Sequence, residues 1–135
     1  MNDRISGSHR KIVPLDLGLL PIEKVNRALG LNLAAAIVHF SVRAQAHAEK
    51  RHPAAFSICL RNIRRIVAAP DYIGKAPDQT DGFELIGEAP RDHAIVLVAI
   101  KMRQDKAGRY AVVSTYVIDR NKLERRVRKG FLKRA

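Results

Sequence analysis

The chain has 135 residues, a formal net charge of +12 and a sequence pI of about 10.6. Hydrophobic residues make up 47% and charged residues 28%, which excludes a disordered chain, and its one cysteine excludes a disulfide framework or a cysteine-rich zinc site. The apolar runs are too short for a transmembrane helix, and residues 1–11 lack the apolar core of a signal peptide. We therefore expect a single, soluble, cytoplasmic domain over residues 1–135, with a charge that favours a polyanionic partner.

The first part of the chain favours two helices with a short strand between them. In chain order we expect a helix over about 21–29, a strand over 35–40 and a helix over about 42–52. Gly30 is a typical residue to close the first helix, and Ser41 is a typical N-cap for the second. A longer helix is the alternative to the strand, because the alanines in this segment favour helix.

The clearest helix follows, over about 56–69. Apolar residues recur there at the spacing of one helix face, and they are Phe56, Cys59, Leu60, Ile63, Ile66 and Val67. Since Cys59 lies on this apolar stripe, we expect a buried core thiol and not a nucleophile. Pro70 disfavours helical backbone at the residue before it and so ends the helix.

Strands dominate the remaining sequence. After a Gly-, Pro- and Asp-rich loop over 74–82, we expect strands at 83–86, 94–102 and 110–118, and a hairpin connection over 104–108. Asp119 is a typical N-cap for a last helix over about 120–129, which Gly130 ends. This order predicts an α+β fold, in which N-terminal helices pack on a small antiparallel sheet of about four strands and the C-terminal helix is basic.

Positive charge is concentrated in two blocks. Residues 43–70 contain six basic residues and one acidic residue, residues 121–135 contain seven and one, and residues 71–92 are net acidic. The last helix suits phosphate contacts, although a solubilising helix face would explain it equally well. The residues that we expect to bind nucleic acid are Arg43, Lys50, Lys101, Lys122, Arg125, Arg126 and Lys129.

The first candidate for catalysis is the segment from His47 to Pro53. On a helix, His47 and Arg51 lie four residues apart and share a face. An imidazole can accept and donate protons near neutral pH, and a guanidinium fork matches a phosphate. Cleavage of an RNA phosphodiester needs these groups, because the 2′-hydroxyl must lose a proton as it attacks phosphorus. From spacing alone, a solvated helix end with incidental histidines is the more common explanation.

The second candidate is Ser114-Thr115-Tyr116 in the last long strand. Strand alternation places Ser114 and Tyr116 on one face and Thr115 on the other. Their hydroxyls can orient a phosphate and Tyr116 can stack on a base, whereas ordinary strand propensity explains the same residues. Lys101 ends a strand, where it is either a cation for the transition state or edge protection.

Together these segments resemble a known family over about residues 35–132. The chain is similar to phage-associated nuclease domains of the barnase–EndoU–colicin–RelE-like group. The motifs that carry the resemblance are, in order, His47-x-x-x-Arg51-His52-Pro53, Ala69-Pro70-Asp71-Tyr72-Ile73, Ala94-Ile95-Val96-Leu97-Val98, Tyr110-Ala111-Val112-Val113-Ser114-Thr115-Tyr116 and Lys122-Leu123-Glu124-Arg125. Ala48 and Ala69 depart from the family pattern, which has Ile and Asn at these positions.

The resemblance implies RNA cleavage through a 2′,3′-cyclic phosphate, without a metal or another cofactor. It implies His47 as the general base, Arg51 or His52 as the phosphate or acid partner, and Ser114, Thr115 and Tyr116 as the polar end of the site. We expect an endoribonuclease of prophage or toxin type, acting on a tRNA or another cellular RNA. Its expected partners are that RNA and an inhibitor or immunity protein, and no membrane.

A second hypothesis is a non-catalytic basic domain that binds RNA or DNA. A structural domain of a phage-derived particle is disfavoured, because the aromatic content is only 5% and the charge is high. Geometry separates the first two hypotheses, since an enzyme must bring His47, Arg51 and the Ser114–Tyr116 segment to one cleft.

Overall fold

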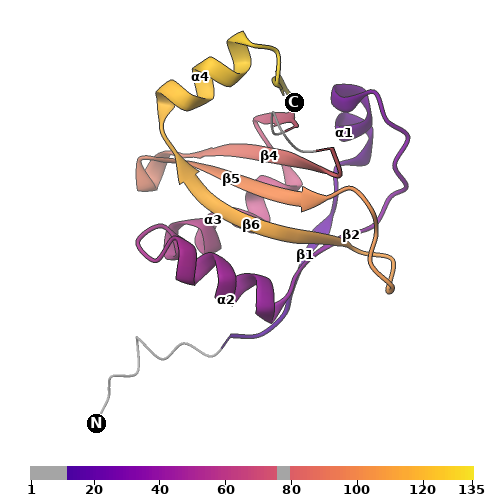
Figure 1. Ribbon diagram of the computed structural model, residues 1–135, viewed down its shortest axis with the longest axis horizontal. Coiled ribbons are helices and arrows are strands. Elements are labelled where there is room, and N and C mark those ends of the chain that lie inside the picture. Colours follow the sequence, from indigo (N-terminus) through magenta and orange to yellow (C-terminus); the bar gives the residue numbers. More distant parts are fainter. Residues whose placement is uncertain (1–11, 76–79) are drawn as a thin grey trace.

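The computed structural model describes residues 12–75 and 80–135, which form a seven-stranded sheet with helices on both faces (Figure 1). The helices are α1 (Ile22–Leu29), α2 (Val42–Arg51), α3 (Phe56–Ala68), α4 (Arg120–Arg128) and the short 3₁₀ helix η2 (Pro90–Asp92). The strands are β1 (Leu15–Leu19), β2 (Ile37–Phe40), β3 (Tyr72–Gly74), β4 (Gly82–Ala89), β5 (Ala94–Lys101), β6 (Tyr110–Ile118) and β7 (Leu132–Arg134). Their order in the sheet is β1-β2-β6-β5-β4-β3-β7.

The prediction of about four antiparallel strands behind N-terminal helices is wrong. A strand, β1, precedes the first helix, and the sheet is mixed because β2 pairs in parallel with β6. Three short strands, β1, β3 and β7, were not predicted from the sequence, and they have five, three and three residues. In β1, Leu15, Leu17 and Leu19 alternate with Asp16 and Gly18, a strand signal that was missed, whereas β3 and β7 are too short to show alternation. In the sheet, β1 pairs with β2, β3 pairs with β4, and β7 pairs with β3.

All four predicted helices are present in the structure as α1, α2, α3 and α4. Their sequences carry strong local signals, which made them predictable. Ser41 Oγ accepts a hydrogen bond from Ala44 N at 3.1 Å and caps α2. Asp119 Oδ1 accepts one from Lys122 N at 2.7 Å and caps α4. Gly30 has a φ of 66°, the left-handed conformation that closes a helix without side-chain strain.

The long predicted strands are confirmed as β5 and β6, and the segment 35–40 is the strand β2 rather than a helix. The strand expected over 83–86 is longer, since β4 pairs with β5 from Gly82 to Ala89. Part of the expected loop over 74–82, residues 76–79, lies outside the described residues, and so does the polar segment Met1–Lys11. None of the described helices is both long enough and apolar enough to cross a membrane.

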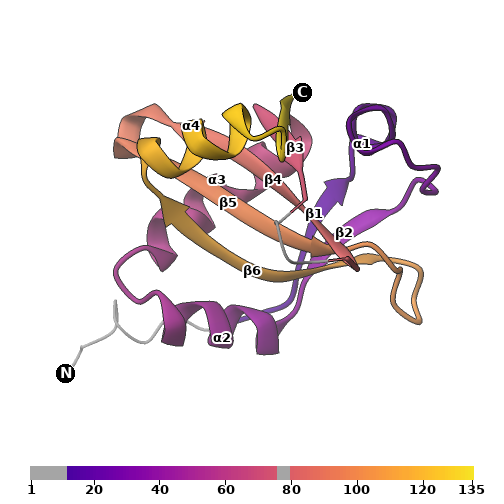
Figure 2. The same cartoon turned by 45° about the horizontal axis from the view of Figure 1, so that its top comes forward.

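The two faces of the sheet are covered differently. On one face α3 packs on the main core, where Cys59 is fully buried, as expected, and its burial raises the pKa of its thiol. On the other face, a smaller apolar cluster forms around Leu97 of β5 and Leu123 of α4. Figure 2 shows α4 in front of the sheet and α3 behind it. We refer to this second face as the α4 face.

Helix α2 runs beside the free part of β6. β2 pairs with only the beginning of β6, where Val38 lies opposite Tyr110 and His39 opposite Ala111. α2 packs against β6 next to this short pairing (Figure 2). The C-terminal part of β6 is therefore flanked by a helix and not by a strand, which brings the end of α2 close to the Ser114–Tyr116 segment.

Candidate active site

The α4 face carries polar residues in the middle of the sheet. The register places Glu84 of β4, Ala99 of β5 and Ser114 of β6 in one row across three strands. Leu97 and Tyr116 lie opposite each other in the next row. Since adjacent strands are about 4.8 Å apart, Glu84 and Ser114 are about 10 Å apart along their row, with only the methyl group of Ala99 between them.

Tyr116 is at the centre of a group of polar side chains from four parts of the chain. Its ring stacks on the imidazole of His52, with 4.9 Å between the ring centroids and 25° between the planes. Lys122 Nζ, from the first turn of α4, lies 5.6 Å from the Tyr116 ring centroid, a distance typical of a cation–π contact. We call His52, Glu84, Tyr116, Lys122 and Arg126 the Tyr116 cluster.

A buried ion pair joins α4 to the sheet within this cluster. Arg126 Nη1 donates a hydrogen bond to Glu84 Oε1, and only 11% and 3% of the two side chains are exposed. Lys122 and Arg126 are four residues apart and therefore project from the same side of α4. A buried charge without a partner is costly, so the guanidinium of Arg126 stays next to the Glu84 carboxylate. Glu84 therefore fixes the position of the guanidinium.

The same surroundings act on the Tyr116 phenol. Burial, and then the nearby charge of Glu84, raise the pKa of Tyr116, while Arg126 acts in the opposite direction. A tyrosine with a raised pKa stays protonated at neutral pH. Tyr116 is therefore a hydrogen-bond donor and not an anion in this site.

The structure separates the three residues of the predicted strand motif as alternation requires. Ser114 and Tyr116 lie on the α4 face, and Ser114 is half-buried. Thr115 is fully buried in the other face, where its hydroxyl donates a hydrogen bond to Leu97 O at 2.8 Å. The Thr115 hydroxyl is thus engaged in holding β5 and β6 together.

The two histidines of the predicted helix motif lie in different places. His47 is exposed on α2 and lines a groove with residues 111–113 of β6. His52 follows the end of α2 with a φ of −136° and a ψ of 62°, outside the helical range, and reaches Tyr116. Arg51 is exposed, and its guanidinium has no hydrogen bond or ion pair with residues 12–75 or 80–135.

The basic residues expected to bind nucleic acid lie in three different places. Lys122 and Arg126 belong to the Tyr116 cluster, and Arg43 and Lys101 line the groove with His47. The others are exposed: Lys50, Arg125 and Lys129.

Glu84 is the functional candidate that the sequence reasoning missed. It is 2% exposed and lies in a stretch of β4 that is buried from Gly82 to Gly87. A carboxylate between Phe83 and Leu85 was a usable signal, because an acidic residue within a buried strand requires a cationic partner. Among the described residues, no three His, Cys, Asp or Glu side chains are grouped so that they could hold a metal ion.

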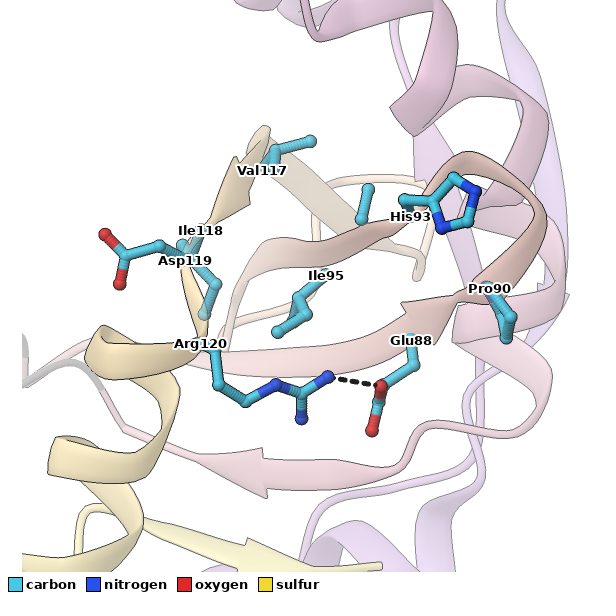
Figure 3. Close-up of a pocket in the computed structure, with 9 residues that line it drawn as sticks. Glu88, Pro90, His93, Ile95, Val117, Ile118, Asp119 and Arg120 are labelled. Atoms are coloured by element: carbon cyan, nitrogen blue, oxygen red, sulfur yellow. Dashed lines mark hydrogen bonds and ion pairs between the residues drawn. The ribbon is translucent and has the colours of Figure 1, made fainter.

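A pocket of about 810 Å³ lies beyond the cluster, at the C-terminal end of β6. Figure 3 shows Arg120 reaching Glu88 across this pocket, with Ile95 and His93 on its other sides. Arg120 Nη2 is 2.8 Å from Glu88 Oε1, and this hydrogen bond lowers the pKa of Glu88. The pair neutralises itself and the Asp119 carboxylate also lines the pocket, so the described lining offers no excess positive charge to a phosphate.

A family profile, described as phage-Barnase-EndoU-ColicinE5/D-RelE like nuclease3, matches residues 18–125. The chain belongs to this nuclease family. The match confirms the family predicted from the motifs and makes the substrate a nucleic acid. In this nuclease, the matched segment includes His52, Glu84, Tyr116 and Lys122. No curated protein and no solved structure matches the chain.

Proposed function

We propose that this nuclease is a metal-independent endoribonuclease with the Tyr116 cluster as its active site. The observation that carries the proposal is the stacking of the His52 imidazole on Tyr116 beside Lys122. This contact unites a group that can move protons with cations that can hold a phosphate. The cluster also lies on the α4 face of the sheet, next to the hydroxyl of Ser114.

His52 has the role of general base and then general acid in this proposal. Its imidazole takes the proton of the 2′-hydroxyl as the 2′-oxygen attacks the adjacent phosphorus. The bond from phosphorus to the 5′-oxygen breaks, and the departing oxygen takes a proton from the imidazolium. The products are a 2′,3′-cyclic phosphate and a free 5′-hydroxyl, and His52 returns to its starting form.

The remaining members of the cluster stabilise the charge that develops on the phosphate. Lys122 supplies positive charge, Arg126 supplies guanidinium N–H donors from the same side of α4, and Tyr116 supplies a neutral hydrogen-bond donor. Glu84 is a positioning residue, because it holds the Arg126 guanidinium through the buried ion pair. We further propose that the protein is a prophage or toxin-type effector that acts on cellular RNA in the cytoplasm. An inhibitor protein would control its activity.

Incubation of the purified protein with RNA in the presence of EDTA tests this function. We expect fragments that end in a 2′,3′-cyclic phosphate, and we expect DNA of the same sequence to stay intact because it lacks the attacking hydroxyl. Intact RNA that is nevertheless bound in a salt-dependent way would contradict the proposal and favour the non-catalytic binding domain.

A further inference from the structure

A second groove, of about 800 Å³, lies beside the Tyr116 cluster between α2 and the base of the β5–β6 hairpin. Helix α2 contributes Arg43 and His47, while Lys101 and Arg103 come from the end of β5 and the following turn. Residues 111–113 of β6 also line it. We call this feature the α2–β6 groove.

The α2–β6 groove has an excess of positive charge that the protein itself does not neutralise. Its arginines and lysine are exposed, and their side chains have no hydrogen bond or ion pair with the described part of the chain. Of its two acidic residues, Asp105 already pairs with Arg109 at 3.2 Å and accepts backbone hydrogen bonds from its own turn. Among the described residues that line the groove, only the Asp81 carboxylate offsets the cations, so this lining favours an anionic ligand.

The groove also offers apolar surface beside these cations. The pairing of β5 and β6 shifts between Ala99 and Ile100, which leaves Val113 as an extra residue on β6. Its side chain is 43% exposed and lines the groove. Cations next to a small apolar surface suit a nucleotide, which has a charged phosphate and a flat base.

Two elements, β5 and α2, lead from the groove toward the Tyr116 cluster. Lys101 follows Ala99 by two residues on β5, so it projects from the same face of the sheet about 7 Å further along. His47 precedes Arg51, the last residue of α2, by four residues, which corresponds to about 6 Å along the helix axis, and His52 follows directly. A chain of nucleotides bound at the cluster therefore meets the groove next.

We propose that the α2–β6 groove binds the phosphates of single-stranded RNA on one side of the cleaved bond. The inference rests on the proposed function, because it takes the Tyr116 cluster as the place of cleavage. In this arrangement His47 contacts the flanking nucleotides and not the reacting phosphate. In the pocket at the other end of β6, Arg120 is paired with Glu88, so the groove is the better of these two hollows for the phosphates that flank the cleaved bond.

Charge reversal in the groove tests the proposal. The test variant carries Arg43→Glu and Lys101→Glu, and the matched control carries Lys24→Glu and Arg27→Glu on α1, which packs against β3. Binding is measured with a twelve-nucleotide single-stranded DNA, which the 2′-hydroxyl reaction cannot cleave, over a range of salt concentrations. We expect the test variant to bind at least tenfold more weakly, with a salt slope smaller by about one to two. The control should bind like the wild type.

Cleavage by the same proteins is then compared on a twelve-nucleotide RNA and on dinucleotides of mixed sequence, which are too short to reach the groove. The test variant should lose at least ten times more of its kcat/KM on the long RNA than on the dinucleotides. Unchanged binding, or an equal loss on both substrates, would overturn the groove proposal and leave the proposed function standing. A third outcome is possible, in which the test variant binds more weakly but the wild type cleaves no RNA. That outcome would support nucleic-acid binding by the groove and contradict the proposed enzymatic function.

Discussion

Replacement of His52 by alanine is expected to lower kcat for RNA cleavage by a factor of about 10²–10⁴, the usual contribution of a general acid–base group. The reason is that the substitution removes the imidazole that contacts Tyr116, and no other histidine is seen to touch the cluster among the described residues. Initial rates at saturating RNA, with thermal unfolding as a check on folding, measure the effect.

Two further variants separate proton transfer from stacking and from binding. His52→Phe keeps a flat ring against Tyr116 but cannot move protons, so it should be as inactive as the alanine variant. His47→Ala should lose less than about tenfold, mainly through a higher KM, because His47 lines the groove. The opposite ranking, with His47 essential and His52 dispensable, would restore His47 as the base that the motif predicts.

Replacement of Glu84 by glutamine is expected to lower the free energy of unfolding by about 3–5 kcal/mol, as is usual when one partner of a buried ion pair is removed. The Arg126 side chain is only 11% exposed, so its charge would remain in a buried site without the carboxylate of its partner. Urea unfolding at constant pH measures the difference between the variant and the wild type.

A double variant distinguishes a catalytic role of the ion pair from a purely structural one. Glu84→Leu combined with Arg126→Met removes both charges and should regain most of the lost stability, because apolar side chains can replace a buried pair at little cost. Its kcat should remain about 10²–10³ times lower than that of the wild type, since the phosphate has lost the N–H donors of the guanidinium. A stable double variant that cleaves RNA at the wild-type rate would assign the pair to folding alone.

Elements with strong local signals could be predicted from the sequence. The apolar stripe of α3, the caps at Ser41 and Asp119 and the long apolar strand β5 all depend on neighbouring residues, and all are confirmed. β1, β3 and β7 depend on which strand edges the rest of the fold leaves free. Patterns of three residues carry no information about those edges, which explains why β3 and β7 were missed, whereas the alternating leucines of β1 were an available signal.

The candidate site likewise contains residues that the sequence indicated and residues that only the structure brings together. The motif 47–53 and Tyr116 stood out in the sequence, but helical spacing favoured His47 because it extends the helix through this segment. α2 ends at Arg51, and the non-helical backbone of His52 carries its ring to Tyr116. The pairing of Glu84 with Arg126 joins positions 42 residues apart, and only the register of the sheet and the packing of α4 bring them together.

The central claim, attack by the 2′-hydroxyl at the Tyr116 cluster, is tested most directly with an RNA that contains one 2′-deoxynucleotide. The sugar is placed immediately before a bond that the wild-type protein cleaves, and the reaction is run in EDTA. We expect cleavage to stop at that bond and to continue at the other sites in the same molecule. Continued cleavage at the modified bond would contradict the claim, because no 2′-oxygen is present there to attack phosphorus.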